Sequence, residues 1–324
     1  MVKILVVLPV KEHHKELFLK SAPKAEFIYE DASKVTKDML KDVDATIGNI
    51  SPALLAGCEN IKWVQLNSAG TDGYTADGVL SKDAVLTNAT GAYGLAISEH
   101  MVAAVLCMMK KLDLYSSNMR THEWKDMGLV SSVWGSKTLV VGLGDIGGEF
   151  AKRMHAMGSS VTAIRRNKAE RPDYVDALYQ MDMLDECLKE ADIVASCLPG
   201  TKETYKLYDA DKFSKMKEGA FFLNIGRGTA VDSNALLNAL DTGHLAGASI
   251  DVTDPEPLPK DHPLWNAKNL LITPHVSGGY HLNETFERIV AISADNLARF
   301  VSGKPLKNVV DLDTGYRKFI KSGE

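Results

Sequence analysis

Short apolar segments alternate with charged, helix-periodic segments along most of the chain. Within residues 1–90 we expect strands at residues 4–8, 27–29, 45–47, 63–66 and 85–87, because these segments are apolar and rich in β-branched or aromatic side chains. The intervening residues, such as 11–20 and 36–41, are charged and have helical character. This alternation predicts an α/β unit with a parallel sheet.

A long apolar segment, residues 96–109, follows this unit. Glu99 and His100 lie within it, so we expect a buried helix and not a membrane span. The alternation then resumes, with strands expected at residues 138–141, 161–164, 193–198, 221–225, 248–250 and 270–273. This second series predicts another domain built on a parallel sheet.

One more helical stripe precedes a short tail, and it is formed by Phe286, Ile289, Ile292 and Leu297. The tail is too small to build a core of its own, so we expect it to return to the first domain. The sequence therefore predicts two doubly wound parallel-sheet α/β domains. Residues 1–95 and 296–324 would form one discontinuous domain, and residues 96–295 would form a domain inserted within it.

Residues 113–135 show little periodicity and place Trp124 and Trp134 among polar residues. Aromatic side chains are enriched in protein interfaces. We expect this arm to hold two copies of the chain together as a homodimer. The alternative is that both tryptophans pack on their own domain.

The net charge, the cysteines and the N-terminal residues indicate which partners and which cellular compartment to expect. The chain of 324 residues has a formal net charge of −5 and no long basic block, which argues against nucleic acid and anionic membranes as partners. Its four cysteines are widely spaced, as expected of free thiols in a reducing cytosol. The N-terminus lacks the features of a signal peptide. We therefore expect a cytoplasmic protein, and we expect no metal site.

The expected strand at residues 138–141 ends in Gly142-x-Gly144-x-x-Gly147, and a helical pattern follows at once. In this setting the first glycine permits a tight turn, the second lets the backbone approach a pyrophosphate, and the third lets helix pack on strand. The phosphates would bind the amides that begin the helix, which include those of Asp145 and Ile146. The motif predicts a dinucleotide site; the alternative is a glycine turn without a ligand.

The residues after the second strand of this domain indicate which dinucleotide binds. An acidic residue in this position normally holds the ribose hydroxyls of NAD. Here the sequence has Arg165-Arg166 and no carboxylate. Because an arginine pair can hold a 2′-phosphate through charge-assisted hydrogen bonds, we expect NADP(H) in preference to NAD(H). The alternative is a solvated basic turn.

Three charged residues in the second half of this domain together suit hydride-transfer chemistry. Reducing a 2-oxo acid requires a cation for the carboxylate, a proton donor for the developing alkoxide and a group that tunes the donor. Arg227, between two glycines, suits the first role, and His275, after an expected strand, suits the second. Glu256, in a proline-stiffened loop, would orient the histidine and favour its imidazolium form. Taken singly, each residue has an ordinary structural explanation.

Several separate motifs, in order, resemble the D-isomer-specific 2-hydroxyacid dehydrogenase family from about Ile4 to Tyr316. They are VGLGDIG (141–147), ADIVASCLPGTKET (191–204), FFLNIGRGTAVD (221–232), ASIDVTDPEPLPKDHPLW (248–265), NLLITPHVSG (269–278) and GKPLKNVVD (303–311). The resemblance implies a flavodoxin-like substrate domain, a Rossmann domain, a cleft between them that holds cofactor and substrate, and a dimer. The family usually has an acidic residue where this chain has Arg165. In this departure the chain resembles the glyoxylate/hydroxypyruvate reductase branch of the family.

The resemblance also implies roles for individual residues. Arg227 would bind the substrate, Glu256 would tune the acid, and His275 would be the acid/base. The loop with Ser68, Ala69 and Gly70 would hold the substrate carboxylate. Further residues would line the cofactor, namely Leu198, Pro199, Thr204, Ile225, Gly226, Asp251 and Ser277. The candidates for the wall of the substrate pocket are Asn49, Ile50, Ser51 and Tyr93 of the small domain and the neighbouring Tyr280 or Trp134.

The resulting hypothesis is an oxidoreductase that transfers a hydride from NADPH to a small 2-oxo acid and yields the (R)-2-hydroxy acid. Two alternatives stay open. One is an NAD(H)-dependent enzyme for a larger branched or aromatic 2-oxo acid. The other is a dinucleotide-sensing protein, since the family that this chain resembles includes a transcriptional corepressor.

Overall fold

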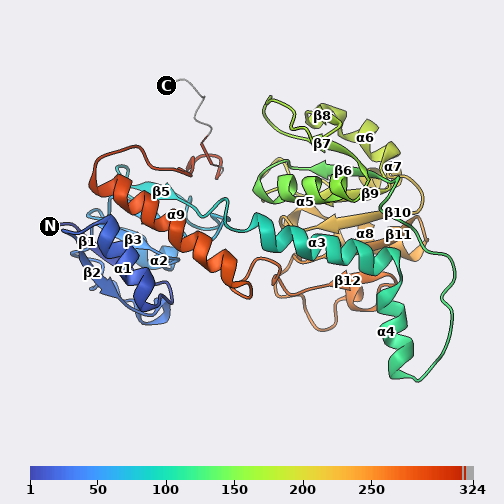
Figure 1. The fold of residues 1–324 in the computed structure, drawn as a ribbon, viewed down its shortest axis with the longest axis horizontal. Helices are drawn as coiled ribbons and strands as arrows, with labels where there is room; N and C mark the ends of the chain where they lie inside the picture. The colour runs from blue at the N-terminus through green and yellow to red at the C-terminus, as the bar shows by residue number, and fades with distance from the viewer. Residues whose placement is uncertain (316, 319–324) are drawn as a thin grey trace. The chain divides into compact units, whose positions relative to one another are not determined.

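The computed structural model describes residues 1–315 and 317–318, and it divides the chain into two compact units (Figure 1). Unit 1 comprises Met1–Tyr93 and Leu282–Glu324, and unit 2 comprises Gly94–His281. The predicted region of family resemblance ends at Tyr316, which lies outside the described residues. The chain thus has two α/β units, and the first is discontinuous in sequence.

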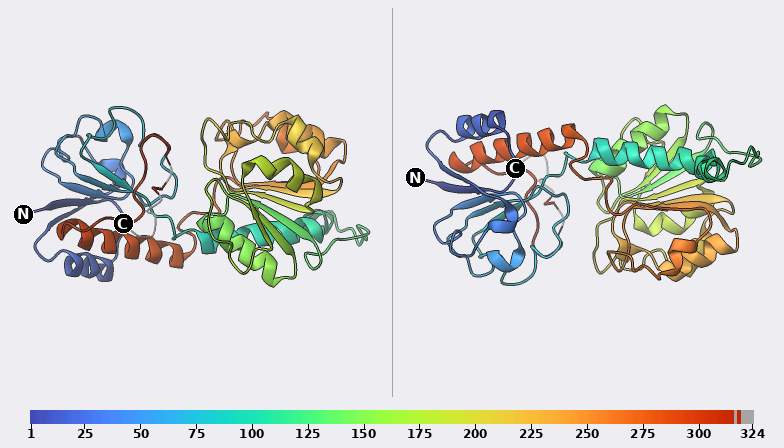
Figure 2. Two further views of the ribbon diagram at one scale, coloured as in Figure 1. Left: turned by 90° about the horizontal axis from the view of Figure 1, so that it is seen from above. Right: turned by 90° about the horizontal axis from the view of Figure 1, so that it is seen from below.

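Unit 1 is built on a five-stranded sheet in which all strands are parallel. The strand order is β2 (Glu26–Tyr29), β1 (Lys3–Val6), β3 (Ala45–Ile47), β4 (Trp63–Gln65) and β5 (Val85–Thr87). Helices α1 (Glu12–Ser21) and α9 (Asn283–Val301) cover one face, and the short α2 (Pro52–Leu55) lies on the other (Figure 2). All five predicted strands are confirmed.

The predicted helix at residues 36–41 is wrong, because this segment forms turns after a short 3-10 helix, Ala32–Lys34. Leu40 is its one buried residue, and the nearest buried positions outside it, Val35 and Val43, give no helical stripe with Leu40. The Asn60 Nδ2 group donates hydrogen bonds to the carbonyls of Leu40 and Val43, both at 2.7 Å. A distant side chain therefore holds two backbone carbonyls at the end of this turn segment.

Unit 2 is built on a seven-stranded parallel sheet. The order is β12 (Leu270–Ile272), β11 (Leu245–Ile250), β10 (Ala220–Asn224), β9 (Ile193–Ser196), β6 (Lys137–Val141), β7 (Ser160–Ile164) and β8 (Ala177–Tyr179). The six predicted strands are confirmed. The edge strand β8 was not predicted, because its three residues, Ala-Leu-Tyr, include no β-branched side chain.

Helices cover both faces of the unit 2 sheet (Figure 2). One face carries α3 (Gly94–Met109) and α5 (Asp145–Ala156), which pack on each other. The opposite face carries α6 (Leu184–Glu190), α7 (Ala210–Lys215) and α8 (Ser233–Asp241), with a core that includes Tyr208, Phe213 and Phe222. In the part of the chain that the structure describes, no helix is long and apolar enough to cross a membrane.

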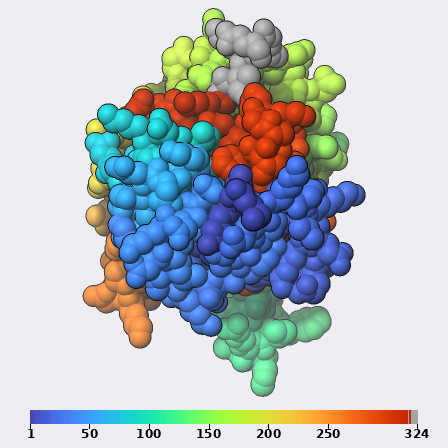
Figure 3. All heavy atoms as spheres, turned by 90° about the vertical axis from the view of Figure 1, so that its left-hand side faces the viewer, coloured from blue at the N-terminus to red at the C-terminus, as the bar shows by residue number. Residues whose placement is uncertain are grey.

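The predicted boundary between residues 295 and 296 is wrong, because it would divide α9, and the whole helix belongs to unit 1. The Phe300 ring packs on Trp63, with centroids 5.2 Å apart. The buried Asn296 donates to Gln65 Oε1 at 2.8 Å and to the Lys307 carbonyl at 3.0 Å. Figure 3 shows the C-terminal residues (red) packed against N-terminal ones (blue) on the face of unit 1.

Substituting Asn296 with alanine should lower the free energy of unfolding by about 3 kcal/mol, because buried partners on β4 and on residue 307 would lose their hydrogen bonds. Chemical denaturation measures this change. Asn238→Ala, at an exposed position of α8, is the control and should change stability by less than about 0.5 kcal/mol. Equal stability of the two variants would mean that Asn296 does not anchor α9.

The arm at residues 113–135 is more ordered than predicted, because α4 (Leu112–Arg120) forms its first part. The remainder, from Thr121 to Gly135, has no regular structure. Trp124 is fully exposed and Trp134 is 79% exposed, although Trp134 lies against Gly158 of its own unit. Leu129 is 95% exposed. The arm thus presents several large apolar side chains at the surface of unit 2.

Candidate active site

The carboxyl ends of the unit 2 strands gather most of the predicted site residues at one edge of the sheet. Because all seven strands are parallel, residues that directly follow them share this edge. These residues are Gly142 after β6, Arg165 after β7, Leu198 and Pro199 near the end of β9, Ile225 to Arg227 after β10, Asp251 after β11 and His275 after β12. Ligands of open α/β sheets bind at such an edge.

The glycine turn between β6 and α5 has the shape that a dinucleotide pyrophosphate requires. Gly142 has a φ of 102°, and a Cβ on Gly147 would lie 2.1 Å from the Gly142 carbonyl oxygen, so both positions require glycine. By contrast, a Cβ on Gly144 would have nothing within 4 Å, which leaves space beside the start of α5. The first amides of a helix have no intrahelical acceptor and attract anions. These residues fit a bound nicotinamide dinucleotide.

Asp145 and Ile146 begin the helix of this turn, as predicted. The Asp145 carboxylate accepts the N–H of Gly94, the first residue of α3, at 3.1 Å. Its side chain therefore joins the first turns of two helices of unit 2.

Arg165 and Arg166 lie beside the glycine turn, because β7 pairs with β6 along its whole length. The Gly142 N–H donates to the Ile164 carbonyl at 2.9 Å, which places the turn next to the residue that precedes Arg165. Arg165 is half-buried and Arg166 is exposed. Two guanidinium groups therefore follow the strand whose end normally meets the adenosine ribose.

Arg227 is held by its two glycine neighbours. A Cβ on Gly226 would lie 2.1 Å from the Leu198 carbonyl oxygen, and a Cβ on Gly228 would lie 2.0 Å from the backbone of Thr253. The buried Asn224 side chain donates to the Arg227 carbonyl at 2.9 Å. The Arg227 backbone is thereby fixed between the loops after β9 and β11.

His275 and Glu256 form the direct pair that the sequence predicted. The His275 Nδ1 and Glu256 Oε1 atoms are 2.6 Å apart, and both side chains are about half exposed. Because Nδ1 is engaged by the carboxylate, Nε2 is the ring nitrogen that faces away from it. An imidazole held by a carboxylate in this way suits proton transfer to a reacting oxygen.

Asp251 holds the turn that carries His275. It is 2% exposed, and its carboxylate accepts the Thr273 hydroxyl at 2.6 Å and the Ser277 hydroxyl at 2.5 Å. It also accepts the N–H groups of Val276 and Ser277, and the Asp251 carbonyl accepts the N–H of His275 at 2.8 Å. Sequence reasoning placed Asp251 and Ser277 beside the cofactor and missed this bracing, because residues 251 and 277 are far apart along the chain.

The remaining predicted cofactor residues shape the loops at the same edge. Leu198 and Ile225 are buried there, and the Thr204 hydroxyl donates to the Pro199 carbonyl at 2.7 Å. The Thr204 side chain thus braces the loop after β9.

The loop that contains Ser68, Ala69 and Gly70 follows β4 in unit 1, and its four carbonyl oxygens from residues 67 to 70 each accept a hydrogen bond. The donors, in order, are the Tyr93 hydroxyl, the Ala89 N–H at 2.9 Å, the Asn88 side chain at 2.8 Å and the Ser68 hydroxyl at 2.7 Å. The loop is further tied by a reciprocal pair in which the N–H groups of Asn49 and Asn67 donate to each other's side-chain oxygens.

Of the residues expected to wall a substrate pocket, Ile50 is wrongly predicted. It is fully buried in the core of unit 1 with Leu55 and Val64. Asn49 and Tyr93 both brace the loop of Ser68 to Gly70. Ser51 is exposed at the start of α2.

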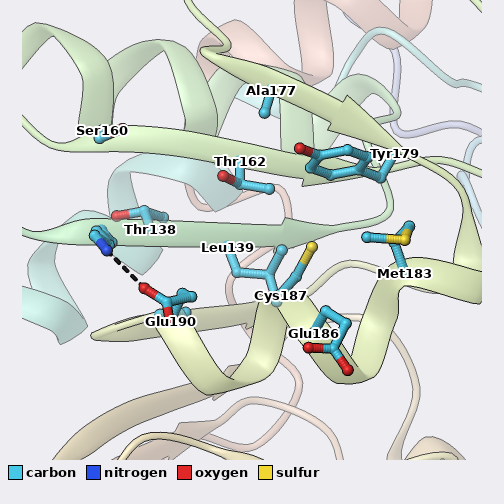
Figure 4. A pocket seen from close by; sticks show the side chains of 12 residues that line it. Thr138, Leu139, Ser160, Thr162, Ala177, Tyr179, Met183, Glu186, Cys187 and Glu190 are labelled. Carbon is cyan, nitrogen blue, oxygen red and sulfur yellow. Dashed lines mark hydrogen bonds and ion pairs between the residues drawn. The ribbon is translucent and has the colours of Figure 1, made fainter.

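Unit 2 also has a hollow of about 310 Å³ away from these residues (Figure 4). It is lined by parts of β6, β7, β8 and α6, among them Leu139, Thr162, Tyr179 and Cys187. Its described lining residues include none of the predicted site residues. Burial raises the pKa of the Cys187 thiol, which is one of these lining groups. The four cysteines are free thiols.

One cluster of metal-ligand side chains occurs among the described residues, formed by His13, His14 and Glu287 of unit 1. The His14 Nδ1 accepts the N–H of Lys11 at 3.0 Å, so its proton lies on Nε2 and is donated to Glu287 at 3.0 Å. This hydrogen bond lowers the pKa of Glu287. The cluster is explained as a hydrogen bond between α1 and α9.

Comparison with known proteins agrees with the dinucleotide-binding geometry of unit 2. The family model described as the NAD-binding domain of D-isomer specific 2-hydroxyacid dehydrogenases matches residues 102–277, more than half of the chain. The chain belongs to this dehydrogenase family. The predicted resemblance is therefore confirmed, and the protein is a nicotinamide-dinucleotide-dependent dehydrogenase.

Relatives of this dehydrogenase include enzymes that are named for their activity. Glyoxylate/hydroxypyruvate reductase B of Escherichia coli (strain UMN026) is 33% identical over 271 residues, which are 81% of this chain and 82% of the relative. A family protein from Aeromonas salmonicida has a TM-score of 0.84 and 32% identity and covers 96% of this dehydrogenase and 99% of its own chain.

A third similar protein is the NADPH-dependent glyoxylate/hydroxypyruvate reductase of Sinorhizobium meliloti, solved with NADP and sulfate. Its TM-score is 0.82 at 27% identity, with 98% of this dehydrogenase and all of that chain covered. The predicted fold class of two parallel-sheet α/β domains is confirmed for this dehydrogenase.

Proposed function

We propose that this dehydrogenase reduces a small 2-oxo acid to the (R)-2-hydroxy acid with NADPH. The observation that carries this proposal is the pair of His275 and Glu256, which presents an imidazole at the carboxyl ends of the unit 2 strands, the end of the sheet that also carries the glycine turn. Two relatives named glyoxylate/hydroxypyruvate reductase support a small 2-oxo acid as the substrate.

In this mechanism the chain orients the substrate and delivers a proton. Arg227 and the amides of the loop at Ala69 and Gly70 bind the substrate carboxylate, since a guanidinium fork matches a carboxylate. A bound nicotinamide supplies the hydride that reduces the keto carbon. His275 gives the proton on Nε2 to the carbonyl oxygen as that oxygen becomes an alkoxide, while Glu256 holds Nδ1 and stabilises the charged ring.

Arg165 and Arg166 are proposed to select NADP(H) by binding its 2′-phosphate. Their place after β7 supports this role, as does the NADP in the Sinorhizobium meliloti structure. NAD(H) lacks this phosphate and would gain nothing from the two charges.

The double variant Arg165→Ala/Arg166→Ala should lower kcat/KM for NADPH by about a hundredfold, because each charge-assisted hydrogen bond contributes about 1.5 kcal/mol or more. The value for NADH should change less than about threefold. Steady-state kinetics with both coenzymes measure the ratio. As a control, Lys168→Ala removes a nearby exposed charge. An unchanged NADPH-to-NADH ratio in the double variant would contradict the assignment.

The arm is proposed to form a homodimer. Trp124 and Leu129 are almost completely exposed, and such apolar side chains are typical of a surface that a second copy covers.

A substrate panel tests the proposed function. Oxidation of NADPH should be fastest with glyoxylate or hydroxypyruvate and slower with pyruvate, 2-oxoisocaproate, phenylpyruvate and ketopantoate. Faster turnover of phenylpyruvate or 2-oxoisocaproate would shift the substrate class to larger 2-oxo acids, and no turnover of any member would contradict the proposal.

A further inference from the structure

Within the described part of the chain, the backbone carbonyl groups in the loop of Ser68 to Gly70 are hydrogen-bonded, whereas two of the backbone N–H groups are not. All the carbonyl oxygens from residue 67 to residue 70 are paired within unit 1. The N–H groups of Ala69 and Gly70 have no acceptor among the described residues. Two consecutive amide donors are therefore left for a group from outside the chain, which the proposed function identifies as the substrate carboxylate.

The geometry of the peptide bond links the hydrogen bonds of the carbonyl groups to the directions of the N–H groups. In a planar trans peptide the C=O of one residue points opposite to the N–H of the next. The donor that holds the Ser68 carbonyl thus fixes the direction of the Ala69 N–H. In the same way, the donor on the Ala69 carbonyl fixes the direction of the Gly70 N–H.

The donor on the Ala69 carbonyl is the side chain of Asn88, at 2.8 Å. Asn88 is 3% exposed and directly follows β5, the strand that pairs with β4. Its Oδ1 accepts the hydroxyl of Thr90 at 2.8 Å and the N–H of Thr90 at 3.2 Å. Because Thr90 takes the oxygen, the amide group of Asn88 is turned toward Ala69.

We propose that Asn88 is a positioning residue for the substrate carboxylate: its amide holds the Ala69 carbonyl and so aims the Gly70 N–H at the anion. This inference rests on the proposed function and deepens it, because it assigns the residue that orients the carboxylate-binding loop. In this role Asn88 acts through the Ala69 carbonyl and not by contact with the substrate or the cofactor. The ligand that it serves is any small carboxylate bound at the loop.

The Asn88→Ala variant tests this role. It should raise both the KM for hydroxypyruvate and the dissociation constant for oxamate, a carboxylate without a reducible ketone, by about tenfold. The dissociation constant for NADPH should change less than about twofold, and so should the KM for a neutral 2-oxo amide. A role in stability alone would not separate a charged substrate from a neutral one.

Asn60→Ala is the matched control in the same unit. Asn60 also donates from its side chain to backbone carbonyls, those of Leu40 and Val43, but on a different loop. It should lower the melting temperature as Asn88→Ala does, yet leave the oxamate dissociation constant unchanged. Asn88→Asp, which replaces the donor by a carboxylate oxygen, should weaken oxamate binding more than Asn88→Ala.

Each outcome decides between the two proposals. Unchanged oxamate binding in a folded Asn88→Ala variant would overturn the role of Asn88, whatever the wild-type turnover. Equal losses for oxamate, the neutral amide and NADPH would also overturn it, as a general structural effect. Tight wild-type oxamate binding without turnover of any 2-oxo acid would contradict the proposed function and leave the Asn88 comparison intact. If the wild type does not bind oxamate, the carboxylate site and this inference both fail.

Discussion

Replacing His275 with alanine should lower kcat for a 2-oxo acid by about a hundredfold to ten-thousandfold, the usual contribution of a positioned general acid. The variant removes the ring whose Nδ1 lies 2.6 Å from Glu256, and with it the proton for the developing alkoxide. The KM for NADPH should change little, because the glycine turn remains intact. Steady-state and single-turnover rates of NADPH oxidation measure the loss.

Two further variants make this test specific. Glu256→Gln keeps a hydrogen-bond acceptor for the ring but removes the charge, so its kcat should fall between those of the wild type and His275→Ala. His155→Ala, at an exposed position of α5, is the control and should keep wild-type kcat. If His275→Ala retained more than about a tenth of wild-type kcat, the proton would come from another group.

Replacing Arg227 with alanine should raise the KM for the 2-oxo acid and lower kcat/KM by at least about a hundredfold. A bidentate contact between a guanidinium and a carboxylate comprises two charge-assisted hydrogen bonds, together worth about 3 kcal/mol or more. The glycines on either side hold the Arg227 backbone against Leu198 and Thr253, so truncating the side chain should leave the fold intact.

The conservative variant Arg227→Lys keeps the charge and loses the fork, and its kcat/KM should be intermediate. Arg153→Ala removes an arginine that pairs with Glu149 on α5, and it serves as a control for general charge effects. A KM for hydroxypyruvate that does not change in Arg227→Ala would mean that another cation binds the carboxylate.

Features that repeat at a fixed spacing or follow an apolar segment were predictable from the sequence. The strands of both sheets are short apolar segments, and parallel pairing then brings the residues after them to one edge. This is why Gly142, Arg227 and His275 could be assigned to one site before the structure was known. The role given to Glu256 required its carboxylate to reach His275, and the two side chains lie 2.6 Å apart.

Features that depend on hydrogen bonds between side chain and backbone were not predictable. Asn60 holds the carbonyls of Leu40 and Val43 in the turn segment, and Asp251 braces the turn of His275 through residues more than twenty positions away. Asn88 holds the Ala69 carbonyl in a similar way. Such contacts have no periodicity, and a single sequence gives no sign of which partner an asparagine or aspartate will find.

The domain boundary was misplaced for a related reason. The apolar stripe of α9 predicts a helix but does not specify which sheet it covers. Asn296 and Phe300 decide this through contacts with Gln65 and Trp63, which are distant in sequence. The whole helix therefore belongs to unit 1.

The central claim is that this dehydrogenase reduces a 2-oxo acid with NADPH and gives the (R)-2-hydroxy acid. The most direct test incubates the purified protein with hydroxypyruvate and NADPH, and measures both coenzyme oxidised and the configuration of the glycerate formed. The proposed function predicts one (R)-glycerate for each NADPH oxidised, and almost none with His275→Ala. Formation of (S)-glycerate, or the same yield from His275→Ala, would contradict it.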